Sequence, residues 1–250
     1  MRRDQGMNVV IDVTTTTKPY RQEALVPPRG AAIAGVIFSL LTIVGLGLVR
    51  YAVPAVPSLP GIWLTEPTHR NAVRLALDSV PFAGIAFLWF IGVLRSRLGE
   101  REDQFFATVF IASGLLFVAC LFVASAVMDA LIESVAAGNI HGEVYYFGRH
   151  IDDTLLNLFA MKMAAVFMFS TCTIALRTAL FPRWIAVSGY GCAALLLAVI
   201  ADWRWITLVF PLWMLLVSAQ ILVARSAPII PGGPERDTVS HGNKHSAERG

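Results

Sequence analysis

The stretch FFATVFIASGLLFVACLFVASAVM, residues 105–128, decides the fold. It contains no charged side chain and no proline. As a helix it is long enough to cross the hydrocarbon layer of a bilayer, which is roughly 30 Å thick. The helical form is required, because lipid offers no hydrogen-bond partner to a free backbone group. This stretch therefore predicts a transmembrane helix.

Five further apolar stretches predict five more transmembrane helices. They cover residues 31–49, 73–94, 155–180, 184–200 and 205–224. The chain of 250 residues is 56% hydrophobic and 15% charged, whereas soluble domains carry about 25% charged residues. Short strands of alternating polarity, as in a β-barrel, do not occur in these stretches. The predicted fold class is all-α, a polytopic membrane bundle of six transmembrane helices over residues 31–224.

The two ends of the chain, residues 1–30 and 225–250, are polar and lack a helical period, which predicts disordered tails. Fourteen of the 20 Lys and Arg residues fall in these tails and in or next to two of the predicted connections, and five fall in or next to the other connections. Lysine and arginine accumulate on the cytoplasmic side of membrane proteins. We therefore expect a multi-pass protein of the plasma membrane with both termini in the cytoplasm.

Several classes of site are not indicated by the composition. The net charge of +3 is too small to predict nucleic-acid binding. Cys120, Cys172 and Cys192 lie inside apolar stretches without metal-ligand spacing, so we interpret them as packing residues. No phosphate loop, dinucleotide fingerprint, haem signature or nucleophile motif occurs. The sequence predicts no cofactor and no catalytic set.

The polar stretch between residues 129 and 162 is the longest connection between the apolar stretches. We expect the third helix to continue to about Ala137 and to end at Gly138, because glycine favours helix termination. The fourth helix is then predicted to begin near Ile151. This geometry would gather acidic and histidine side chains around a mouth on the outer side, above Lys162.

Lys162 lies about 10 Å inside the predicted fourth span, where a charge normally has a partner. Asp78 is the predicted partner, because it lies at a similar depth in the second span, and Arg74 precedes it by one helical turn. The functional interpretation is a polar pocket that holds an ion, a proton or a small solute. In the structural alternative, Lys162 extends its ammonium group toward the interface and the charges only connect helix ends.

We therefore predict an outward-facing binding cluster, in a protein that is not an enzyme and that binds a small solute, a lipid or a partner protein. Its candidate residues are Lys162, Asp78, Arg74, Asp129, Glu133, His141, His150, Asp152 and Asp153. A small secondary transporter is the first alternative. A metal-dependent membrane enzyme at the outer face is the second, although the histidine and acidic spacing matches no metal motif. Besides the lipid bilayer, a homo-oligomer or a membrane partner protein is left open.

Four short segments resemble one known group of proteins. They are FLWFIGVLR (87–95) continuing into LGERE (98–102), SGLLF (113–117), ALR (175–177) and FPRW (181–184). Together they are similar to uncharacterised bacterial six-span membrane proteins of the DUF4386 type, over roughly residues 30–225. The resemblance implies the six-helix architecture and a bacterial plasma membrane. It implies no activity, so no functional residue is transferred.

Overall fold

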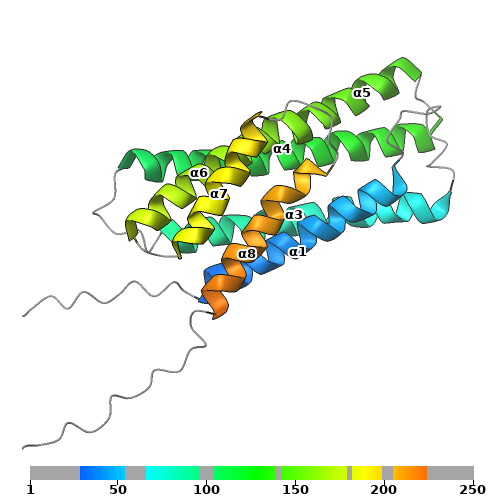
Figure 1. Ribbon diagram of the computed structural model, residues 1–250. Coiled ribbons are helices and arrows are strands. Elements are labelled where there is room, and N and C mark those ends of the chain that lie inside the picture. The colour runs from blue at the N-terminus through cyan, green and yellow to red at the C-terminus, as the bar shows by residue number, and fades with distance from the viewer. Residues whose placement is uncertain are drawn as a thin grey trace, which may run out of the picture.

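The computed structural model describes residues 29–53, 66–95, 104–138, 142–178, 182–198 and 205–223. This part of the chain is helical throughout and contains no strand (Figure 1). Its elements are α1 (Arg29–Ala52), α3 (Pro67–Arg95), α4 (Gln104–Ala136), α5 (Gly142–Thr154), η1 (Leu155–Ala160), α6 (Met161–Thr178), α7 (Arg183–Ala198), η2 (Ile206–Leu208) and α8 (Val209–Val223). Residues 1–28 and 224–250 lie outside the described residues. They include all of the predicted C-terminal tail and all but two residues of the predicted N-terminal tail.

Five helical segments of the described chain are long and apolar enough to cross a membrane. They are α1, α3, most of α4, the continuous segment from Gly142 to Arg177, and η2 with α8. The all-α prediction is therefore confirmed for the described residues, and their long apolar helices are consistent with a helical membrane bundle. The remaining apolar helix, α7, has 16 residues and a length of about 24 Å, which is shorter than the usual span.

Successive helices run up and down between two ends of the bundle. We call the end where α1 and α4 finish the distal end, and the opposite end, where α8 finishes, the proximal end (Figure 1). α1 packs along α3 and α8, and α4 packs against α3, α5 and α6. α7 lies mainly on α6. Most of the contacts are thus made between neighbours in the chain, as short connections require.

A cluster of phenylalanine rings forms the centre of the bundle. Phe38 from α1, Phe87 from α3, Phe117 from α4, Phe167 from α6 and Phe210 from α8 are all 0–1% exposed. Their ring centroids lie 4.6 Å apart for Phe38 and Phe87, 5.0 Å for Phe87 and Phe167, and 4.8 Å for Phe117 and Phe210. Aromatic pairs at these distances stabilise a core beyond their buried area. The cluster therefore connects five helices at one level.

The turn after α4 matches the prediction, and the start of the next helix does not. α4 ends at Ala136, and Gly138 has a φ of 68°, the left-handed conformation that ends helices. The next helix begins at Gly142, nine residues before the predicted start near Ile151. It continues without a break through the π-helical element η1 into α6. Most of the predicted loop is thus helix α5, which packs on α4.

Candidate functional site

α4 and the segment from α5 to α6 form a helical hairpin that is longer than a membrane span. α4 has 33 residues and the segment Gly142–Arg177 has 36, which correspond to about 50 and 54 Å of helix. α4 is apolar up to about Met128, and the segment from α5 to α6 is apolar from about Leu155 onward. The polar ends of both helices lie at the distal end of the bundle, which the end of α1 and the start of α3 also reach (Figure 1). We call this part, residues 129–138 and 142–154, the distal hairpin.

The two helices of the distal hairpin approach each other closely at Gly148. A Cβ atom added to Gly148 would lie 2.7 Å from Cδ2 of Leu131, so glycine is needed for the observed spacing. Tyr145 and Asp152, which lie one turn to either side of Gly148, are buried on the same face of α5. Because this buried face repeats at helical spacing, α5 is an amphipathic helix that packs on α4.

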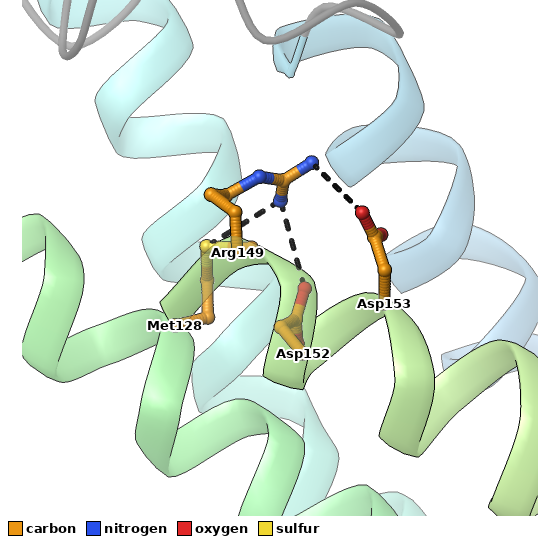
Figure 2. A network of polar contacts seen from close by, with 4 residues as sticks. All are labelled: Met128, Arg149, Asp152 and Asp153. Carbon is orange, nitrogen blue, oxygen red and sulfur yellow. Dashed lines mark hydrogen bonds and ion pairs between the residues drawn. The ribbon is translucent and has the colours of Figure 1, made fainter. Parts of the chain in front are cut away.

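Arg149 holds the polar contacts at the base of the hairpin. Its Nη1 atom lies 3.6 Å from Oδ2 of Asp152 and 4.0 Å from Sδ of Met128, and its Nη2 atom lies 4.0 Å from Oδ2 of Asp153 (Figure 2). The two carboxylates follow Arg149 by three and four residues, the spacing that brings side chains together on a helix. A single guanidinium group therefore faces two acids, one buried and one exposed.

The buried acid, Asp152, has an unusual environment. It is 4% exposed, and it lies in α5, outside the apolar span that begins at Leu155. Burial raises the pKa of Asp152 to about 7, because desolvation disfavours the charged carboxylate. The neighbouring Arg149 guanidinium lowers this pKa and the Asp153 carboxylate raises it, both by less than the effect of burial. Asp152 is therefore a buried carboxyl group that titrates close to neutral pH.

The other predicted site residues on the hairpin face solvent. Asp129, Glu133, His150 and Asp153 are exposed, and His141 lies outside the described residues. Glu143, which was not among the predicted site residues, is exposed as well. The hairpin thus presents several carboxylates outward rather than around one cavity.

Lys162 does not pair with Asp78 in the described part of the chain. Its Nζ atom donates hydrogen bonds to the backbone oxygen of Leu196 at 2.9 Å and to that of Leu197 at 2.6 Å. Asp78 and Arg74 are exposed on α3. The last carbonyls of a helix lack partners within the helix and attract positive charge. Lys162 therefore caps the C-terminal end of α7, a role that no sequence spacing indicates.

Two residues that the prediction omitted are central to this site. Arg149 organises the acids, and its spacing to Asp152 and Asp153 is a signal that the sequence does contain. Gly148 sets the distance between the helices, but its role depends on Leu131, which is 17 residues away in sequence. The local sequence pattern could therefore have identified Arg149, but it could not have identified Gly148.

The described residues contain no group of three or more His, Cys, Asp or Glu side chains close enough to hold a metal ion. The centre of the bundle is occupied by the phenylalanine cluster rather than by polar side chains. Comparison with known proteins gives no further assignment, because no family model, no curated protein and no solved structure matches the chain. The described residues form an all-helical structure with the features of a membrane bundle.

Proposed function

We propose that the chain is a six-span protein of a bacterial plasma membrane that recognises a basic partner protein through its distal hairpin. The proposed count of six spans depends on α7, because the other five segments are already long enough to cross a membrane. α6 ends at the proximal end, and α7 runs from Arg183 at that end to Leu197 at the level of Lys162. α8 starts at the distal end, so α7 must connect the two ends. A short helix can cross the membrane where the bilayer thins locally, or where the residues that flank the helix complete the span.

The orientation follows from the distribution of positive charge. In the described chain four arginines lie at the proximal ends of their helices and four lie at or near the distal ends. The asymmetry comes from the full sequence, in which 14 of the 20 Lys and Arg residues fall in the two tails and in or next to the connections after residues 94 and 180. The positive-inside tendency supports a cytoplasmic location for the proximal end. The distal hairpin then faces outward. The segments similar to the DUF4386 type support the same six-span arrangement.

The exposed face of α5 carries the proposal for recognition. Phe147 is 67% exposed and Val144 is 55% exposed, and the two are one turn apart on α5. Phe147 precedes Leu155 by eight residues, about 12 Å along the helix, so it lies beyond the apolar span. Tyr146 is also exposed. Exposed apolar and aromatic side chains at one place, outside the lipid-facing surface, are typical of protein-binding sites.

The charge of the hairpin indicates what kind of partner fits. Between residues 129 and 153 the chain has five carboxyl side chains and one arginine, a formal net charge of −4 with histidine neutral. A second copy of the chain would bring like charges together, whereas a partner with lysine or arginine residues around an apolar patch would complement the surface. Transport has less support, because the phenylalanine cluster fills the centre of the bundle.

Site-specific photo-crosslinking in intact cells tests this proposal. A photoreactive phenylalanine analogue in place of Phe147 is expected to crosslink one partner protein through a basic segment. The same analogue in place of Phe82, which is 66% exposed on α3 within the apolar span, serves as the matched control and should crosslink lipid instead. Each adduct is identified by mass spectrometry.

The acidic residues provide the second arm of this experiment. Glu133→Gln with Glu143→Gln removes two exposed carboxylates that lie outside the Arg149 contacts. We expect this double variant to lose most of the crosslink at position 147 while it keeps its level in the membrane. Crosslinks at 147 that match those at 82, or that survive the loss of both charges, would contradict the proposal.

A further inference from the structure

A cavity of about 490 Å³ lies between α1 and the start of α8, at the distal end of the bundle. Its volume is within the range of small-ligand sites. The lining residues come from one face of α1 and from the turn that leads into α8; they are Ile43, Gly47, Arg50, Tyr51, Trp205 and Leu208. None of these residues belongs to the distal hairpin, so a ligand of this cavity is independent of the proposed function.

The polar end of the cavity is built around Arg50. Nη2 of Arg50 donates a hydrogen bond to Oγ1 of Thr207, and the guanidinium carbon lies 5.2 Å from the centre of the Trp205 ring. These contacts hold the guanidinium plane against the wall of the cavity. Its N–H groups diverge in one plane, which suits the oxygens of a phosphate or carboxylate. Trp205 is 61% exposed, and tryptophan is enriched at the membrane interface.

The other end of the cavity is apolar and lies deeper along the helix. Ile43 precedes Arg50 by seven residues, which corresponds to about 10 Å of helix. Gly47 lies between them, and a Cβ atom added there would have no other atom within 4 Å. Together with Leu208 these residues leave an open apolar channel below the arginine. The cavity thus changes from charged to apolar over the depth at which a lipid changes from head group to acyl chain.

We propose that this cavity binds one membrane phospholipid, with its phosphate at Arg50 and an acyl chain beside Gly47. The positive guanidinium complements the phosphate, and Trp205 marks the depth at which head groups lie. The apolar channel from Gly47 to Ile43 takes the first part of the chain. A free phosphate ion would leave the channel unfilled, and a neutral lipid would bring no negative charge to the guanidinium group.

Lipid titration of the purified full-length chain, followed by native mass spectrometry, tests this assignment. The probes are dioleoylphosphatidylglycerol, dioleoylglycerol without the phosphate, and inorganic phosphate as a competitor. We expect one saturable phosphatidylglycerol, at least about tenfold weaker binding of dioleoylglycerol because a charge-assisted hydrogen bond is lost, and no competition by phosphate. Tight binding of dioleoylglycerol, or competition by inorganic phosphate, would overturn the proposal.

Two glycine variants make the test specific to this cavity. Gly47→Leu places a side chain in the channel, and Gly92→Leu places the same side chain at an α3 glycine that likewise has no atom within 4 Å of an added Cβ. Both variants should fold, which their melting temperatures check. We expect Gly47→Leu to weaken phosphatidylglycerol binding at least about tenfold and Gly92→Leu to leave it unchanged. Equal binding by the two folded variants would show that the lipid lies elsewhere.

Discussion

The ammonium group of Lys162 donates a hydrogen bond to the backbone oxygen of Leu197 at 2.6 Å, and this contact connects α6 to the end of α7. Leu196 accepts a second bond from the same atom at 2.9 Å. α7 has 16 residues and packs mainly on α6. A positive charge at the C-terminal carbonyls of α7 therefore stabilises the end of this helix.

Lys162→Met is expected to destabilise the protein, because it removes a charged donor from two helix-end carbonyls. Hydrogen bonds to charged groups contribute about 1.5–3 kcal/mol each, so the melting temperature in detergent should fall by several degrees. Lys162→Arg keeps the charge and should recover part of the loss. Thermal unfolding measured by circular dichroism provides the comparison.

Asp78 supplies the control for this prediction. Asp78→Leu should have little effect on the melting temperature, and Lys162→Met with Asp78→Leu should match Lys162→Met alone. A double variant that is clearly more stable than Lys162→Met would instead mean that the two charges are coupled. Such coupling is what the similar depth of Asp78 and Lys162 in their predicted spans indicates.

Asp152 should make the stability depend on pH. Burial raises the pKa of Asp152 from 3.8 to about 7, so the folded state holds this proton more tightly than the unfolded state does. The stabilisation of the folded state by this proton is therefore fully present below about pH 4. It is lost as the pH rises through 7. At about 1.4 kcal/mol per pKa unit, the change is on the order of 4 kcal/mol.

Asp152→Asn removes this titration while keeping a similar shape. We expect the melting temperature of the variant, relative to the unchanged protein, to rise between pH 4.5 and 8. The measurement is a series of thermal unfolding curves in detergent at four or five pH values. A difference that is the same at every pH would show that the ion pair with Arg149 decides the stability and that the proton does not.

Gly35 allows α1 and α8 to pack closely. A Cβ atom at Gly35 would clash with Oγ of Ser218, so Gly35→Ala should separate the two helices and lower the melting temperature. Ser218→Gly in the same chain removes the obstructing side chain and should recover much of the loss. Gly30→Ala is the matched control on α1, because an added Cβ there meets nothing within 4 Å.

The outcome for Gly35 is read from the same unfolding curves. A Gly35→Ala variant as stable as Gly30→Ala would contradict the close packing of α1 on α8. A lack of recovery by Ser218→Gly in the Gly35→Ala background would contradict it as well.

Much of the fold could be predicted because the bilayer imposes a length on every span. The apolar stretches at 31–49, 73–94 and 105–128 all lie within observed helices. The helical end at Ala136 and the role of Gly138 were also predictable, since they depend on local backbone preference. These features need no information about neighbouring helices.

The candidate site was less predictable, because its contacts depend on tertiary packing. α5 resembles a loop in sequence because Gly142 and Gly148 lower helical propensity, and only the contact of Gly148 with Leu131 shows why the second glycine is needed. The two hydrogen bonds of Lys162 to Leu196 and Leu197 are made to backbone oxygens, which carry no signature in the sequence. An acidic residue at similar depth was therefore the natural but unsupported choice.

The central claim is that the distal hairpin faces the outside of the cell, and cysteine labelling in intact cells tests it most directly. The chain would carry Glu143→Cys or Arg183→Cys after replacement of its three native cysteines, which lie within helices. Both positions are exposed, at the distal and proximal ends respectively. A membrane-impermeant maleimide should label position 143 in intact cells and position 183 only after permeabilisation. Labelling of position 183 in intact cells, with position 143 protected, would contradict the account.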